Sequence, residues 1–141
     1  MKRFFLLLAI LLSGQANAQT AFLDKREFSA RNGVTRVKIG VSHTRQHAVD
    51  LTVRLKEAGK DSETPGKVMS EGVKITPDHF KIPPGKIRKV TIAFETGVSQ
   101  RTPYFACVLY QPQVERNEAG GPTGGSMSLA TESCSRFWVV P

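Results

Sequence analysis

Short stretches in which apolar and polar residues alternate recur along this 141-residue chain, and they constrain its fold more than any other feature. The clearest are 37–41, 49–55 and 90–94, where Val, Ile, Leu or Phe occupies every second position. A period of two puts successive side chains on opposite faces of a strand, one toward a core and one toward water. Residues 104–110 are apolar on both faces, which is typical of a central strand. No window shows a helical period, so we expect an all-β protein.

Turn residues separate the expected strands at short intervals. Asn32-Gly33 predicts a tight turn ahead of 34–41, and Pro83-Pro84-Gly85 excludes both a helix and ladder pairing. We expect 56–70, which is polar and contains glycines and a proline, to form a surface loop. Glycine-rich 120–125 is expected to be a flexible connector. Short strands joined by regular turns favour one β-sandwich domain.

The N-terminus has the three-part order of a secretory signal peptide. Two basic residues precede an apolar run at 4–12, and Ala16-Asn17-Ala18 forms a small-residue cleavage site. The apolar run is far shorter than the roughly 20 residues that span a bilayer. We therefore expect residues 1–18 to be a cleaved signal peptide, residues 19–141 to be a single exported domain, and no stable membrane insertion.

Charge and cysteine usage exclude several classes of function. The formal net charge is +8, but the basic residues are scattered rather than gathered into a run, so nucleic-acid binding is not predicted. The two cysteines, Cys107 and Cys134, most simply form one disulfide in an oxidising compartment. Their separation is too wide for a C-x-x-C redox or metal pair. The sequence therefore predicts a disulfide, no metal site and no cofactor.

Residues 73–92 contain several features in a fixed order. A strand ends at Thr76-Pro77, and an aromatic residue, an apolar-Pro-Gly turn and an alternating strand follow. This segment resembles the middle of the N-terminal domain of periplasmic pilus-assembly chaperones, the PapD-like family. Residues 22–26 are similar to that family's first strand with its basic residue, and 136–141 to its last strand. The resemblance implies an immunoglobulin-like β-sandwich and a periplasmic location.

The chain also departs from that family in three ways. Family members have two domains, whereas the resemblance covers the first one only. The acidic residue expected just before the penultimate strand is missing from 99–103. Val140 stands where the family usually has an Arg, at a position tied to the junction between the domains. The loss of that charge fits a chain without the second domain, which is what we expect here.

The resemblance also implies a binding site for protein partners. In the family, two basic side chains hold the C-terminal carboxylate of a pilus subunit, and Arg26 and Arg136 stand at the matching positions, with Lys25 as a rival to Arg26. A donor strand at 126–132 would fill the subunit's open groove with Met127 and Leu129. The family uses more large apolar residues there. Either this plug is short, or classical subunit capping has been lost.

No arrangement of residues points to catalysis. His43 and His47 have a metal-ligand spacing for a helix, but they lie between two expected strands, where we expect both to be exposed. His79 lies beside Asp78 without a nucleophile elbow, and no phosphate-binding glycine loop is present. We do not expect an enzyme.

Two functions from different classes remain. The first is a periplasmic chaperone-like protein that binds subunits of a pilus or surface fibre by β-strand addition, with an outer-membrane usher as a further partner. The alternative is an exported immunoglobulin-like subunit that is a structural or adhesive part of a surface assembly. A subunit assembled by strand exchange should lack its final strand. Residues 136–141 form a recognisable final strand, which favours the first function over the alternative and over a secreted binder of a small anion or metal.

Overall fold

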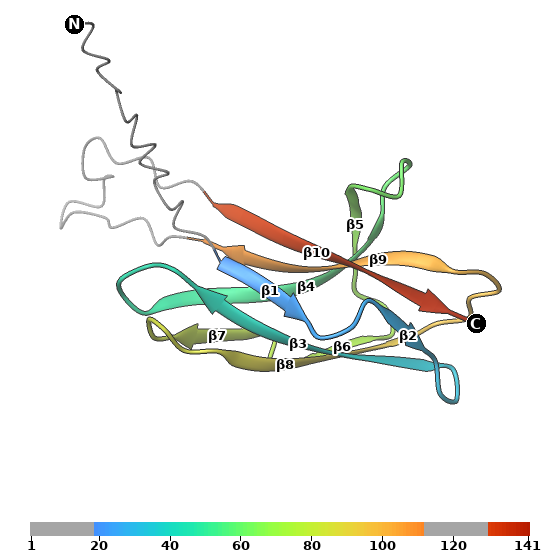
Figure 1. Ribbon diagram of the computed structural model, residues 1–141, viewed down its shortest axis with the longest axis horizontal. Helices are drawn as coiled ribbons and strands as arrows, with labels where there is room; N and C mark the ends of the chain where they lie inside the picture. The colour runs from blue at the N-terminus through green and yellow to red at the C-terminus, as the bar shows by residue number, and fades with distance from the viewer. Residues whose placement is uncertain (1–18, 112–129) are drawn as a thin grey trace, which may run out of the picture.

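The computed structural model describes residues 19–111 and 130–141, and these ranges form two facing β-sheets without a helix (Figure 1). One sheet, the β3–β8 sheet, has the strand order β1-β3-β8-β6. Its strands are β1 (Gln19–Leu23), β3 (Val34–His43), β8 (Arg88–Glu95) and β6 (Val73–Thr76). The all-β sandwich expected from the sequence is therefore confirmed.

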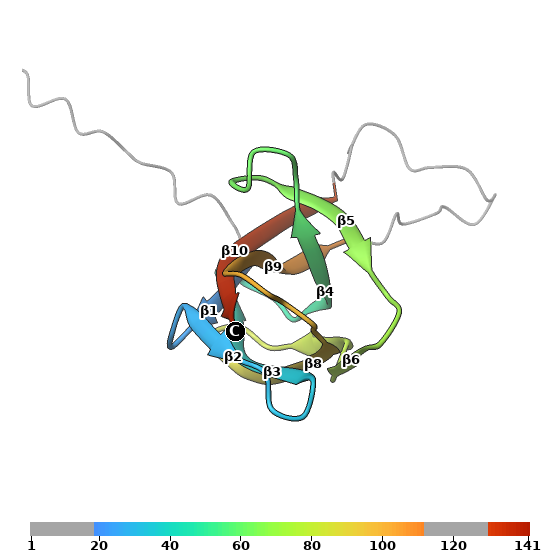
Figure 2. The ribbon, with the colours of Figure 1, turned by 90° about the vertical axis from the view of Figure 1, so that its right-hand side faces the viewer.

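The second sheet, the β9–β10 sheet, has the strand order β2-β10-β9-β4-β5, and β7 also pairs with β4. Its strands are β2 (Glu27–Ser29), β10 (Thr131–Val140), β9 (Thr102–Tyr110), β4 (Val49–Ala58), β5 (Pro65–Met69) and β7 (His79–Ile82). Every strand pair in the two sheets is antiparallel except β2 with β10. The chain changes sheets between its first two strands: β1 lies in the β3–β8 sheet, and β2 lies in the β9–β10 sheet (Figure 2).

The core lies between the sheets and is filled by the alternating residues of the expected strands. On β3 these are Val37, Ile39 and Val41, all of them buried. An aromatic cluster closes the end of the core near the C-terminus, where ring centroids of Phe94 and Tyr104 are 5.0 Å apart and those of Tyr104 and Phe137 are 5.9 Å apart. Burial raises the pKa of Tyr104, and the carboxylate of Glu57 adds to this effect.

The turn signals in the sequence correspond to turns in the structure. Asn32 and Gly33 both have positive φ, 52° and 77°, and the backbones of Arg31 and Val34 are hydrogen-bonded to each other across them. Two consecutive positive φ angles are the signature of the tight hairpin turn that Asn-Gly favours. Pro83-Pro84-Gly85 lies between β7 and β8 and belongs to neither strand.

The expectation of a surface loop over 56–70 is wrong at both ends. β4 continues to Ala58, and β5 occupies Pro65–Met69, so only 59–64 connects the two strands. β5 is an edge strand in which only Gly66 and Met69 are half-buried and the other residues are exposed, so it has no apolar alternation to reveal it. Pro65 is tolerated because it is the first residue of an edge strand, where its missing N–H costs least.

In the part of the chain that the structure describes, no helix is long and apolar enough to cross a membrane. The expected signal peptide, residues 1–18, lies outside the described residues. The glycine-rich connector at 120–125 also lies outside them.

Candidate functional site at the free edge of β10

β10 is paired along most of its length on one side only. β9 pairs with residues 131–139, whereas β2 pairs with Trp138, Val139 and Val140 alone. Within 19–111 and 130–141, no strand pairs with the second edge of β10 over 131–137. Such an edge presents backbone N–H and C=O groups that an added strand can use.

β1 lies beside this edge but belongs to the other sheet (Figure 1). The two strands are joined through side chains, because the Gln19 amide donates to the Thr131 carbonyl (2.6 Å) and the Ser135 hydroxyl donates to the Ala21 carbonyl (2.8 Å). The sandwich therefore has a long side, between β1 and β10, where the two sheets are held together by side chains rather than by a shared ladder.

Arg26 lies against the C-terminal half of this edge. Its guanidinium Nη1 donates to the carbonyl of Arg136 (3.0 Å), and its own carbonyl accepts the N–H of Trp138 (2.8 Å). The residue is exposed. One of the five guanidinium N–H donors of Arg26 makes this bond, which leaves others for a ligand at the edge.

Arg136 points away from the core, because its neighbour Phe137 on β10 is fully buried. Its Nη1 donates to the carbonyl of Ser62 in the β4–β5 loop (3.1 Å), and its guanidinium lies 5.2 Å from the centroid of the Trp138 ring. The structure thus brings Arg26 to the backbone of Arg136, while the Arg136 side chain lies on the outer face of the β9–β10 sheet.

Arg101 is a third cation at this place, and the sequence interpretation missed it. Its guanidinium carbon is 3.9 Å from the centroid of the Trp138 ring, and its Nε donates to the carboxylate of Glu27 (2.9 Å). Arg101 lies two residues before Pro103, which pairs with Trp138, and no local sequence pattern reveals that pairing. We call Arg26, Arg101, Arg136 and Trp138 the arginine–tryptophan cluster, in which Arg101 is paired with the carboxylate of Glu27, whereas Arg26 and Arg136 donate to backbone carbonyls.

The predicted disulfide between Cys107 and Cys134 is present and joins directly opposite residues of β9 and β10. Beside it the Glu132 carboxylate forms an ion pair with Lys56 and lies 3.9 Å from Arg54. The two sulfurs and this carboxylate are close enough to hold a metal ion, but both sulfurs are consumed by the disulfide and are not thiolates. Met127 and Leu129, the expected donor-strand residues, lie outside the described residues.

The histidines form no joint site. His43 is buried, so the expectation that it is exposed is wrong, whereas His47 is exposed as expected. His79 is exposed, hydrogen-bonded to Thr52 (3.0 Å) and 3.8 Å from the Asp50 carboxylate. The structure therefore separates the three histidines between the core and the surface.

Comparison with known proteins identifies the fold. No protein-family model matches the sequence, and no curated protein sequence matches it either. Among solved structures, the Escherichia coli chaperone DraB superposes with a TM-score of 0.61 at 13% identity, over 89% of this chain and 56% of DraB. The chain has the fold of a chaperone domain. The resemblance found in the sequence is thus confirmed at the level of the immunoglobulin-like, PapD-like fold.

Several of the similar structures are complexes of a chaperone with a subunit. The SafB chaperone, solved with the SafA pilin of Salmonella enterica, has a TM-score of 0.60 at 13% identity, covering 90% of this chain and 56% of that one. CsuC, from a complex of chaperone and tip subunit of the Csu pili of Acinetobacter baumannii, has a TM-score of 0.57 at 9% identity, covering 87% and 56%. The chain spans a little over half the length of these chaperones.

Proposed function

We propose that the protein is a periplasmic chaperone-like module that binds subunits of a pilus or surface fibre by β-strand addition. The partner's strand pairs with the free edge of β10 over 131–137, and its C-terminal carboxylate is held by the arginine–tryptophan cluster. No step of this function is catalytic. The proposal includes a signal peptide at 1–18, a single working domain at 19–141, and an outer-membrane usher as a further partner.

The observation that carries the proposal is the combination of a free strand edge with a group of arginines at its end. Arg26 already donates to one carbonyl oxygen at that edge, and its remaining N–H donors could form charge-assisted bonds with a partner's carboxylate. The similar structures add support, since one contains a pilin and another a tip subunit bound to the chaperone. Met127 and Leu129 are the side chains proposed to enter the partner's groove.

The alternative function, an exported structural or adhesive subunit, is less consistent with the strand content. A subunit that is completed by strand exchange needs an open groove in its own sandwich. Here β10 fills the position beside β9 and places Phe137 and Val139 in the core. The sandwich is closed by its own last strand and does not require a donated one.

The test is co-expression of the exported protein with candidate fibre subunits encoded beside its gene. Arg136→Ala should reduce the recovered complex, because a charge-assisted hydrogen bond contributes roughly 1.5 to 3 kcal/mol, or about ten- to a hundredfold in affinity. Arg136→Lys should lose less than Arg136→Ala, but not be neutral if the contact is bidentate. Arg36→Ala, an exposed arginine of the other sheet, is the matched control. Equal recovery for Arg136→Ala and Arg36→Ala would contradict the carboxylate site.

A further inference from the structure

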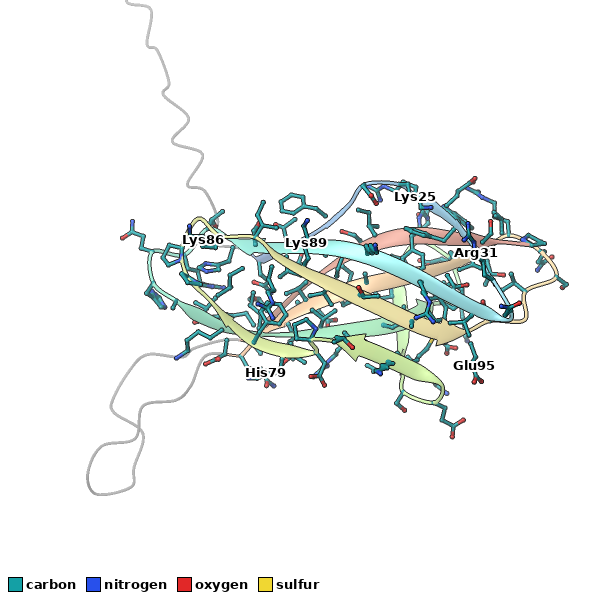
Figure 3. The ribbon with its side chains drawn as sticks, turned by 90° about the horizontal axis from the view of Figure 1, so that it is seen from below. Lys25, Arg31, His79, Lys86, Lys89 and Glu95 are labelled. Carbon is teal, nitrogen blue, oxygen red and sulfur yellow. A yellow bond between two sulfur atoms is a disulfide. The ribbon has the colours of Figure 1, made fainter. Side chains whose placement is uncertain are left out.

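The outer face of the β3–β8 sheet has a strong excess of positive charge. Its strands contain a single acidic residue, Glu95 at the end of β8. The basic residues at the outward-facing positions of the same strands are Arg36, Lys38, Lys74 and Lys89, all exposed. None of them forms an ion pair with a described residue. Figure 3 views the molecule from this side, with Lys89 on β8 and Lys86 in the turn before it.

One end of this face contains an apolar hollow of about 560 Å³. Phe22 on β1 and Ile87 in the turn before β8 line it, and they are two of the large apolar side chains that stay exposed, at 51% and 67%. Gly40 lies between them, and a Cβ at this glycine would come within 3.2 Å of the Ile87 side chain. Lys38 and Lys89 also line the hollow together with Asp24, so its apolar surface lies beside two cations and one carboxylate.

We propose that this face docks on a membrane surface rich in anionic lipids. The lysines and arginines pair with lipid phosphates, and Phe22 and Ile87 enter the boundary between headgroups and acyl chains. An apolar group beside a basic surface is the arrangement by which proteins bind such membranes without spanning them. The cations are spread over three strands rather than converging on one point. Mobile lipid headgroups can match such a spread, whereas an acidic protein would need fixed charges at the same spacing.

This docking leaves the proposed partner site free. The arginine–tryptophan cluster lies on the β9–β10 sheet, on the other layer of the sandwich. Trp138 is the only tryptophan in the chain, so its fluorescence reports on that layer alone. A protein that docks through the β3–β8 sheet keeps Trp138 away from the lipid.

The test is binding of the exported, purified protein to vesicles of phosphatidylglycerol and of phosphatidylcholine at 100 mM salt. We expect binding to phosphatidylglycerol only, weakened as the salt concentration rises. Lys38→Gln with Lys89→Gln should weaken binding about twenty-five-fold, since each lysine near an anionic surface contributes about fivefold. Lys60→Gln with Lys67→Gln removes the same charge from exposed positions around β5 and should change binding little. No binding to phosphatidylglycerol, or an equal loss in both pairs, would overturn the proposal.

A second comparison tests the apolar contact and the orientation. Phe22→Ser with Ile87→Ser should weaken vesicle binding, whereas Val68→Ser, an exposed apolar residue of β5, should not. Brominated lipids should leave Trp138 fluorescence unquenched. Strong quenching would show that the β9–β10 sheet docks instead and would overturn the assignment. Thermal unfolding of every variant is the control, and each should be folded as stably as the wild type because the changed positions are exposed.

Discussion

His43 and His47 are four positions apart at the junction of β3 and β4, yet they occupy opposite environments. His43 is 5% exposed, whereas His47 is on the surface. The Nδ1 atom of His43 accepts the backbone N–H of Arg45 (3.1 Å), so Nε2 carries the proton and donates to the carbonyl of Ile82 (2.9 Å). The ring thus links the end of β3 to the end of β7. Residue type and spacing do not reveal this, because it depends on where a distant strand ends.

His43→Ala should lower the free energy of unfolding by about 2 kcal/mol. The substitution leaves a cavity and removes the partner of the Ile82 carbonyl, and each effect destabilises a buried site. Denaturant unfolding measures the loss. His47→Ala is the matched control and should change the stability by less than about 0.5 kcal/mol. Similar values for the two variants would show that the His43 ring does not hold the strands together.

The β4–β5 hairpin shows why alternation of apolar residues does not predict a mostly polar strand such as β5. Its loop is organised by Asp61, whose carboxylate accepts bonds from the Thr64 hydroxyl (2.8 Å) and from the N–H groups of Thr64 and Glu63. These bonds, the Thr64 side chain first, lower the pKa of Asp61. The glycines and polar residues in the sequence indicate a loop, but they do not reveal that β5 pairs with β4 after this loop.

Gly66→Ala should destabilise this hairpin. A Cβ at Gly66 would lie 3.0 Å from the carbonyl oxygen of Ala58 and 3.1 Å from that of Glu57, so the backbones of β4 and β5 would have to separate. We expect a loss of about 1 to 3 kcal/mol in the free energy of unfolding. Gly97→Ala, where a Cβ would meet nothing within 4 Å, should be neutral or slightly stabilising. Denaturant titration compares the two, and equal stability would contradict the close approach.

The disulfide is the element that the sequence predicted most directly. Cysteine number and the expected export signal were sufficient for this prediction, because two cysteines allow one pairing. Cys107→Ala with Cys134→Ala should lower the free energy of unfolding by about 3 kcal/mol, since the bridge no longer restricts the unfolded chain. Titration of denatured, unreduced wild type should find no thiol. Two reactive thiols per chain, or an unchanged stability in the double variant, would refute this role.

At the scale of the whole molecule, the fold class followed from alternation and turns, and the family resemblance from the order of motifs in 73–92. Both depend on local sequence. The candidate site does not, because its edge arises where β1 joins one sheet and β10 the other. Arg101 and Glu27 meet there from positions 74 residues apart. Such a contact depends on the register in which distant strands pair, and local sequence patterns do not specify that register.

The contact between the two layers at this edge depends on Gln19. Its side chain is 1% exposed, and its Nε2 donates to the carbonyls of Val108 (3.1 Å) on β9 and Thr131 (2.6 Å) on β10. The hydroxyl of Thr131 lies 3.3 Å from its Oε1. Two carbonyl acceptors thus require a donor at this position, which an amide supplies and a carboxylate does not.

Gln19→Glu should therefore destabilise the whole sandwich more at pH 7 than Gln19→Ala, for which we expect about 1 to 3 kcal/mol. A buried carboxylate facing two carbonyl oxygens has its pKa raised in the folded state. As the pH rises, the carboxyl group introduced at position 19 therefore loses its proton at a lower pH in the unfolded chain than in the folded one. The free energy of unfolding of Gln19→Glu, relative to wild type at the same pH, should fall above about pH 4 and recover on acidification. Denaturant unfolding between pH 4 and pH 8 measures this difference. Gln46→Glu, at an exposed position, is the matched control and should show no such slope. Parallel pH profiles for the two variants would mean that Gln19 does not join the layers.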